Sequence, residues 1–524
     1  MKPIIYQILT RLYYSPSRPA VRGGSLAQNG CAKFKDFTAS RLQAIRALGV
    51  THIWYTGVLD HATQTDFSAH GLPADTDVKG QAGSPYAVRD YYNVAPELAT
   101  DIPARLHEFE LLVRRTHKAG MSVIIDFVPN HVARHYTGTY HPFTDCNYYP
   151  GHICDGDWTD TAKLNYGHHD TWQKMLDILL FWSSLGVDGF RCDMAELVPV
   201  EFWAWAIPQV KAAHPDILFI AEVYQPWRYY DYIHQGRFDY LYDKVGLYDT
   251  LIAILKGQAP ASAITGCWQR LGDLAPRMLH FMENHDEQRL ASDFICGDGQ
   301  RALPAMLVSA LIDTCPVMVY FGQELGERGM QSEGFSGCDG KTTIFDYAPV
   351  PTISQWLKEK RVSGERLEVR VKAGAANNPT PSSLTPNPSP LTPNPSPLTQ
   401  SYSRLLHLCL TEPAIIEGKF FDLMYVNPHS SAFDPNRQYA FLRATADELI
   451  IVCVNFDDAP RDIRLRIPQH AFDYLHLPTR STPHAAEELL SNTPLTLLLQ
   501  PDADLPFHLP PTSGIAVRCK LSHS

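Results

Sequence analysis

The sequence predicts an α/β protein built on a (β/α)₈ TIM barrel, with a small subdomain inserted after the third strand and a C-terminal antiparallel β-sandwich. Three observations favour this fold class. Short apolar runs rich in Val, Ile, Phe and Tyr recur as far as Glu324, amphipathic stretches separate them, and the sequence turns β-rich from Phe420. Continuous apolar strands that alternate with helices form parallel sheets covered on both faces. A set of eight such strands suits a closed barrel.

The expected barrel strands follow one another at intervals long enough for a helix between each pair. In chain order they are Ile4–Leu9, His52–Val58, Ser122–Val128, Val187–Asp193, Leu218–Val223, Tyr240–Lys244, Arg277–His285 and Val317–Glu324. The helical patterns Arg105–Ala119 and Thr171–Leu185 are followed directly by Gly120 and Gly186. A glycine just past the last turn is the expected C-terminal cap of a helix.

A chain of 524 residues exceeds what one hydrophobic core usually serves. We expect a catalytic domain over residues 1–418 and a β-sandwich domain over 419–524. Residues 132–169, rich in Tyr, His, Asp and Gly without clear periodicity, are expected to form the inserted subdomain. Residues 373–400 contain a repeated Leu-Thr-Pro-Asn-Pro-Ser-Pro unit. Their proline density predicts a disordered or polyproline-like insertion without a catalytic role.

Composition limits the partners that the chain is expected to have. The net charge of −11 gives a nucleic-acid partner no electrostatic support. The 11 cysteines are scattered without a CxxC pattern, which favours buried thiols in a reducing compartment over a disulfide framework or zinc site. The N-terminal apolar run is too short for a signal peptide, and no stretch reaches membrane-spanning length. We therefore expect a cytoplasmic protein; its oligomeric state stays open.

Carboxylates fall at one end of the expected strands. Asp126, Asp193, Glu222 and Asp286 each lie at or near the C-terminal end of an apolar run. In a (β/α)₈ barrel these ends converge on one face, where active sites are built. A single strand-end carboxylate is often only a helix cap. Four that share one face predict a catalytic centre.

Four segments carry these carboxylates, and each closes an expected strand. The segments are Asp126–His131, Gly189–Glu196, Phe219–Val223 and Phe281–Glu287. In this order and spacing they resemble the four signature regions of the α-amylase family, glycoside hydrolase family 13. The resemblance covers about the first 330 residues, and the β-rich tail resembles the C-terminal domain of that family.

The resemblance implies a role for each of three carboxylates. Cleaving a glycosidic bond with retention needs a carboxylate nucleophile and a carboxylic acid on either side of the anomeric carbon. By position in the signature regions, Asp193 is the nucleophile and Glu222 the acid/base, while Asp286 binds sugar hydroxyls and favours the oxocarbenium-like state. Glu222 follows the apolar residues 219–221, a setting that raises the pKa of a carboxyl and keeps it protonated.

Four further residues are expected to bind substrate. Arg191 lies two residues before Asp193 on the same side of the strand, so its cation can hold that carboxylate ionised. His131 and His285 lie within signature regions and resemble donors to the sugar ring. Tyr86 resembles the tyrosine of the family that stacks on the sugar. The alternative for Tyr86 is plain packing, and for Arg191 a structural ion pair.

Neighbouring residues are expected to support the site. Asp126 is predicted to tie its strand to Arg191 rather than to catalyse, and Asn130 is compatible with a structural role. Glu287 and Arg289 are expected to line the acceptor side. Lys163 lies where calcium-binding members of the family carry an aspartate, and its ammonium would supply the charge that calcium brings. We therefore expect no metal or other cofactor.

The function expected from this resemblance is retaining hydrolysis of α-1,4-glucosidic bonds in starch, glycogen or maltodextrin, as in α-amylases. A glucanotransferase would use the same covalent intermediate with a sugar acceptor, and the signature regions do not separate the two. A non-catalytic member that binds glucan or a partner protein ranks lower, because all three carboxylates are present. Chain-length and linkage preference stay open.

Overall fold

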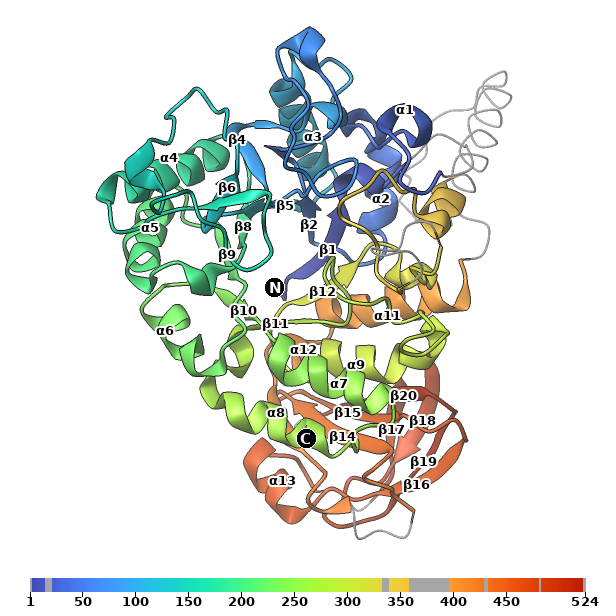
Figure 1. Cartoon of the computed structure of the whole chain (residues 1–524). Coiled ribbons are helices and arrows are strands. Elements are labelled where there is room, and N and C mark those ends of the chain that lie inside the picture. Colours follow the sequence, from blue (N-terminus) through green and yellow to red (C-terminus); the bar gives the residue numbers. More distant parts are fainter. Residues whose placement is uncertain are drawn as a thin grey trace, which may run out of the picture.

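Eight parallel strands close into a barrel at the centre of the molecule (Figure 1). The computed structural model describes residues 2–14, 21–331, 339–357, 395–427, 432–479 and 482–521. Around the barrel the strand order is β1-β12-β11-β10-β9-β8-β5-β2. The strands are β1 (Ile4–Leu9), β2 (His52–Thr56), β5 (Ser122–Phe127), β8 (Gly189–Cys192), β9 (Leu218–Ala221), β10 (Tyr240–Tyr242), β11 (Met278–Phe281) and β12 (Val317–Tyr320). Each lies within one of the expected apolar runs, so the predicted barrel is confirmed.

Helices follow most barrel strands and cover the outside of the barrel (Figure 1). Helices α3 and α4 are capped by Gly120 and Gly186, whose φ angles are +79° and +91°, as predicted. The helices are α1 (Leu26–Asn29), α2 (Ala39–Arg46), α3 (Arg105–Lys118), α4 (His169–Ser184), α5 (Val200–Ala213), α6 (Tyr229–His234), α7 (Asp249–Leu255), α8 (Ala263–Leu271), α9 (Leu303–Leu311), α11 (Pro397–Thr411), α12 (Pro413–Ile416) and α13 (Gln469–Leu475).

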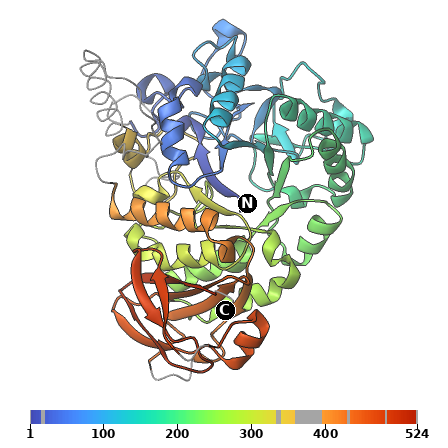
Figure 2. The ribbon, with the colours of Figure 1, turned by 180° about the vertical axis from the view of Figure 1, so that it is seen from behind.

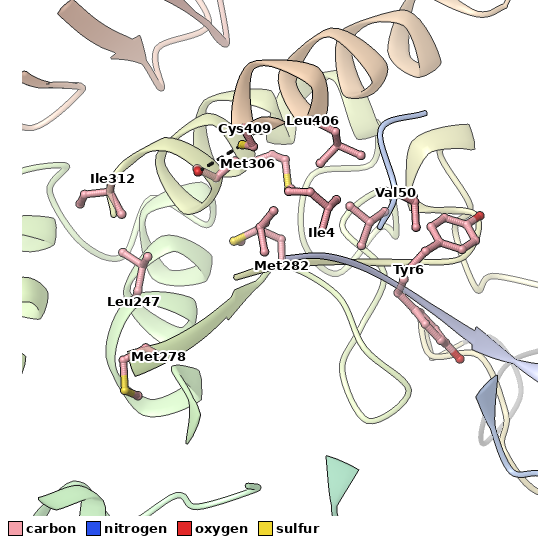
Figure 3. Packing of buried hydrophobic residues seen from close by; sticks show 14 of the residues in the cluster. Ile4, Tyr6, Val50, Leu247, Met278, Met282, Met306, Ile312, Leu406 and Cys409 are labelled. Atoms are coloured by element: carbon pink, nitrogen blue, oxygen red, sulfur yellow. Dashed lines mark hydrogen bonds between the residues drawn. The ribbon is translucent and has the colours of Figure 1, made fainter. Parts of the chain in front are cut away.

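Alternating side chains of each barrel strand face inward and outward. Ile5, Trp54 and Leu279 belong to a cluster inside the barrel. Ile4 belongs to the larger core between the strands and their covering helices. Figure 3 shows it among neighbours from α9 and α11, such as Met306. The barrel is therefore a packed body rather than a pore.

The segment after β5 leaves the barrel as an excursion over its mouth. Within it, β6 (His131–Ala133) pairs antiparallel with β7 (Thr161–Lys163), and His131 lies opposite Lys163. A second antiparallel pair, β3 (Leu59–His61) and β4 (Val88–Val94), follows β2. These two small sheets bring residues of two long loops to the C-terminal ends of the barrel strands.

The C-terminal part folds into two antiparallel sheets that lie beside the barrel (Figure 2). The larger has the order β13-β14-β15-β20-β17-β18, and the smaller pairs β16 with β19. Both faces of β15 are buried, and α9 of the barrel contacts β15 and β20. The strands are β13 (Lys419–Asp422), β14 (Gln438–Ala444), β15 (Glu448–Asn455), β16 (Arg461–Leu465), β17 (His484–Glu488), β18 (Thr493–Leu497), β19 (Leu505–Leu509) and β20 (Ser513–Lys520).

The proline-rich segment expected over residues 373–400 lies mostly outside the described residues. Its last residues differ from the expectation, because α11 already begins at Pro397. Ser396 caps this helix by accepting a hydrogen bond from the N–H of Thr399, and proline is favourable in a first helical turn. The cysteines that the structure describes are unpaired thiols. Within the same residues, no helix has the length and apolar character that crossing a bilayer requires.

Candidate active site

A cavity of about 640 Å³ opens at the C-terminal ends of the barrel strands. Asp193 and Glu222 directly follow β8 and β9, and Asp286 follows β11 after a short loop. The structure brings these three carboxylates to one cavity, together with Tyr86 and His131. The other described residues that line it are Lys79, Ser84, Asp157, Trp158, Asp160, Thr161, Met194, Tyr224, Lys244, Val245, His285, Glu287, Lys341, Ile344 and Phe345.

Arg191 connects the buried carboxylates of the site. This fully buried side chain donates from Nη1 to Oδ1 of Asp193 over 2.6 Å. Its Nη2 atom lies 2.8 Å from Oε2 of Glu222, and Nη1 lies 3.6 Å from Asp126. Tyr242 accepts a hydrogen bond from Nε over 3.2 Å. One guanidinium therefore fixes two carboxylates relative to each other, which a lysine ammonium could not do with the same geometry.

The charge balance of the cluster leaves a proton on Glu222. The pKa of Glu222 is raised to about 7, chiefly by burial; the cation of Arg191 opposes this shift, and the charges of Asp193 and Asp286 contribute to it. Burial also raises the pKa of Asp193, while Arg191 lowers it through its charge and its hydrogen bond. Because like charges this close do not all ionise, and because Arg191 hydrogen-bonds Asp193, Glu222 is the group that keeps the proton.

Glu222 is held from three sides. Besides Arg191, the N–H of Met194 donates to Oε2 over 2.7 Å, and the hydroxyl of Tyr224 donates to Oε1 over 2.5 Å. Neither contact was predicted. No strand periodicity indicates Tyr224, because β9 ends at Ala221 and both Glu222 and Tyr224 lie in the irregular segment after it.

Tyr86 and His285 form the wall of the cavity next to Asp286. Their rings stack at a centroid distance of 5.3 Å and an interplanar angle of 28°. The amide of Gln7 donates to Nδ1 of His285 over 2.9 Å, so the neutral ring carries its proton on Nε2. This atom lies 2.5 Å from the hydroxyl of Tyr86 and 3.2 Å from Oδ2 of Asp286. Burial, and then the charge of Arg191, lowers the pKa of His285 far below its usual range.

His131, in β6, also lines the cavity, and its ring centroid is 5.3 Å from that of Trp158. Burial lowers the pKa of His131 to about 4, so it is a neutral hydrogen-bonding group. Next to it, the carboxylate of Asp155 accepts from Lys163 over 2.7 Å and from the amide of Asn130 over 2.8 Å. Although burial opposes the change, these hydrogen bonds lower the pKa of Asp155.

Asp126 lies beneath the cavity, in β5. Its Oδ2 atom accepts from the indole of Trp54 over 3.2 Å and from the N–H of Gly57 over 3.3 Å. Its Oδ1 atom accepts from Tyr86 over 3.3 Å. Burial raises the pKa of Asp126 to about 7, while Arg191 opposes this shift. These contacts tie β5 to β2, to the turn directly after β2 and to the segment that carries Tyr86.

The expectation for Arg289 is wrong, whereas Glu287 does line the cavity. Arg289 is fully buried behind the site, outside the set of described lining residues. Its Nη1 donates to Glu283 over 2.9 Å, and its guanidinium stacks 4.1 Å above the ring of Tyr320. Glu283 in turn accepts the N–H of Leu290. The loop after β11 thus folds back on itself and turns Arg289 inward.

Known proteins resemble the chain in sequence. A family model described as the catalytic domain of alpha amylase matches residues 37–152 and 154–377, more than half of the chain. An alpha-amylase of Haloarcula japonica, MalA, is 29% identical over 320 residues, which cover 57% of this chain and 42% of the relative. An alpha-1,4-glucan:maltose-1-phosphate maltosyltransferase of Rhodospirillum rubrum is 30% identical over 202 residues, covering 36% of this chain and 28% of the relative. Each alignment spans less than half of the relative's length.

Solved structures share the fold over the whole chain. The crystal structure of an alpha-amylase from Lactobacillus plantarum matches with a TM-score of 0.68 and 21% sequence identity, and the match covers 99% of this chain and 98% of that one. At this identity the likeness shows the shared architecture of barrel and C-terminal sheets.

Proposed function

Since the chain belongs to the α-amylase family of glycoside hydrolases, we propose that it cleaves α-1,4-glucosidic bonds in starch, glycogen or maltodextrin with retention at the anomeric carbon. The observation that carries this proposal is the bridge that Arg191 makes, with Nη1 at 2.6 Å from Asp193 and Nη2 at 2.8 Å from Glu222. It sets an ionised carboxylate beside a protonated one in a single cavity. A retaining glycosidase needs this pair.

In the first step, Glu222 gives its proton to the glycosidic oxygen as the bond between that oxygen and C1 breaks. A carboxylate oxygen of Asp193 attacks C1 from the opposite face. Because Oδ1 is engaged by Arg191, Oδ2 is the attacking atom. The products of this step are a free sugar hydroxyl, a covalent glycosyl ester on Asp193 and an ionised Glu222.

In the second step, Glu222 acts as a base. It takes a proton from water, the water oxygen bonds to C1, and the ester bond to Asp193 breaks. Two inversions at C1 give net retention. The proton that Glu222 lost in the first step is restored, so the cycle closes without a cofactor.

The remaining groups bind the sugar that is being cleaved. Asp286 accepts hydrogen bonds from sugar hydroxyls, and His131 and His285 donate to them as neutral rings. Tyr86 offers its aromatic face to the C–H face of the sugar. Its position is supported by the stack on His285. Because the groups are pre-positioned by mutual contacts, little side-chain entropy is lost on binding.

A glucanotransferase is the alternative, favoured by the similarity to a maltosyltransferase. It would pass the glycosyl ester from Asp193 to a sugar hydroxyl in place of water. Chromatography of the products from maltotriose separates the two activities. Hydrolysis gives only shorter sugars and a net gain of reducing ends, whereas transfer gives oligosaccharides longer than maltotriose without that gain. The products from maltoheptaose and pullulan define chain-length and linkage preference.

A non-catalytic protein that binds glucan or a partner protein is the lowest-ranked reading, since Asp193, Glu222 and Asp286 line one cavity. Release of reducing ends from maltoheptaose by the purified protein, lost on Asp193→Asn substitution, would exclude it. Binding of maltoheptaose without any turnover would favour it.

We also propose that the site beside His131 works without calcium. A calcium ion takes several oxygen ligands and is repelled by an ammonium group. Lys163 instead places its ammonium on Asp155, and Asn130 directs its amide N–H to the same carboxylate. The residues present do not fit a divalent cation, and the chemistry above uses none.

We propose a cytoplasmic location, which the thiols of the protein support. Burial raises the pKa of Cys31 to about 12, and the thiol of Cys192 is likewise buried, so both stay protonated and unpaired. Such thiols suit a reducing compartment. A disulfide found by peptide mapping of protein purified without reductant would contradict this location.

A further inference from the structure

The turn that follows β8 adopts a conformation that ordinary residues avoid. Met194, directly after Asp193, has φ +42° and ψ +40°. A left-handed conformation costs a non-glycine residue free energy and persists only where the surroundings impose it. Here it directs the N–H of Met194 to Oε2 of Glu222 over 2.7 Å. The turn after the nucleophile therefore holds the acid/base.

Glu196, two residues further on, makes the reciprocal contact with the loop after β9. Its Oε2 atom accepts the N–H groups of Tyr224 and Gln225, each over 3.1 Å. The residue is only 7% exposed. Its backbone carbonyl accepts a hydrogen bond from Arg228, whose guanidinium lies over the ring of Tyr232. The side chain of Glu196 therefore holds the start of the loop after Glu222, and its backbone carbonyl holds Arg228 further along the chain.

Glu196 is outside the set of described residues that line the cavity, so it acts on the reaction through its neighbours. We propose that Glu196 is a positioning residue that fixes the proton-donating geometry of Glu222, an inference that rests on the proposed function. Tyr224 connects the two. Its backbone N–H is held by Glu196, and its hydroxyl donates to Oε1 of Glu222.

Loss of the carboxylate frees two backbone N–H groups and releases the loop that carries Tyr224. Glu222 then keeps Arg191 and the N–H of Met194, both on Oε2, but loses the fixed partner of Oε1. A small displacement of a catalytic group costs about 10- to 100-fold in rate. In the first step the loss falls on proton donation to the leaving oxygen, because the contacts of Asp193 are unaffected.

The test compares Glu196→Ala with Glu196→Gln on two substrates. Maltoheptaose needs protonation of its leaving group, whereas α-maltosyl fluoride releases fluoride without it. Because Glu222 is also the base of the second step, the comparison uses kcat/KM, which reports only the steps up to the glycosyl ester. We expect Glu196→Ala to lower kcat/KM on maltoheptaose by about 10- to 100-fold and kcat/KM on the fluoride by less than about 3-fold. Glu196→Gln keeps a side-chain oxygen that accepts both N–H groups, so it retains most of the activity on both substrates.

Glu201→Ala is the matched control, since Glu201 is an exposed glutamate at the start of α5. It should leave both rates unchanged. Equal losses on both substrates for Glu196→Ala, or no loss on either, would overturn the positioning role. If Glu196→Ala does not fold, Glu196→Asp carries the same comparison, because it keeps the charge on an arm shortened by one methylene. A wild-type protein inactive on both substrates would instead overturn the proposed function.

Discussion

Replacing Glu222 with glutamine removes the titratable group of the cluster while keeping its shape. Burial raises the pKa of Glu222 from 4.5 to about 7. Between these values the folded protein binds more protons than the unfolded chain, so the free energy of unfolding of the wild type falls as pH rises through this window. Above pH 7 the loss is complete and amounts to about 3 kcal/mol. Glutamine does not titrate, so the Glu222→Gln protein does not lose this free energy of unfolding as pH rises.

We therefore expect Glu222→Gln to be inactive on maltoheptaose yet more thermostable than the wild type at pH 8. The gain in free energy of unfolding over the wild type should be larger at pH 8 than at pH 5 by about 2–3 kcal/mol. This corresponds to a difference in Tm on the order of a few degrees. Differential scanning calorimetry of both proteins at the two pH values measures this. Glu201→Gln, at an exposed position, is the control and should show no such dependence. An advantage that is equal at both pH values would refute a raised pKa for Glu222.

Asp193→Asn should abolish turnover while leaving the far-UV circular dichroism and Tm close to wild type; unchanged activity would remove Asp193 from the mechanism. Arg191→Lys should lower kcat by about 100-fold or more and also lower Tm, because one ammonium cannot bridge two buried carboxylates. Full activity in this variant would contradict the bridging role of Arg191. The kcat/KM of the wild type should fall above about pH 7 as Glu222 of the free enzyme loses its proton; a profile flat to pH 9 would count against this acid. EDTA should leave Tm unchanged, whereas Lys163→Met should lower it; a sharp drop with EDTA would reveal a bound metal.

The barrel could be predicted from the sequence because apolar runs of strand length and glycine-capped helices are local signals. The run at Ser122–Val128 and the cap at Gly120 are examples, and both are found in the structure. The start of α11 could not be predicted this way. Pro397 is compatible with a disordered proline-rich segment and equally with the first turn of a helix. Packing of α11 against the barrel, not local preference, decides between them.

The carboxylates of the site were predictable for the same reason, since their places at strand ends are set by the barrel. Residues that reach the cavity from long loops, such as Trp158 and Phe345, carry no periodic signal. Arg289 was misassigned because it follows Asp286 closely in sequence. Its direction depends on the ion pair with Glu283, which forms only after the loop has folded back.

The central claim is that Asp193 forms a covalent glycosyl ester during the reaction. A 5-fluoro-α-glucosyl fluoride slows the second step more than the first, so the ester accumulates long enough for mass spectrometry of the intact protein and its peptides. The account predicts one added glycosyl group on the peptide that contains Asp193 and none in Asp193→Asn. A label on another residue, or products of inverted configuration by NMR without any label, would contradict it.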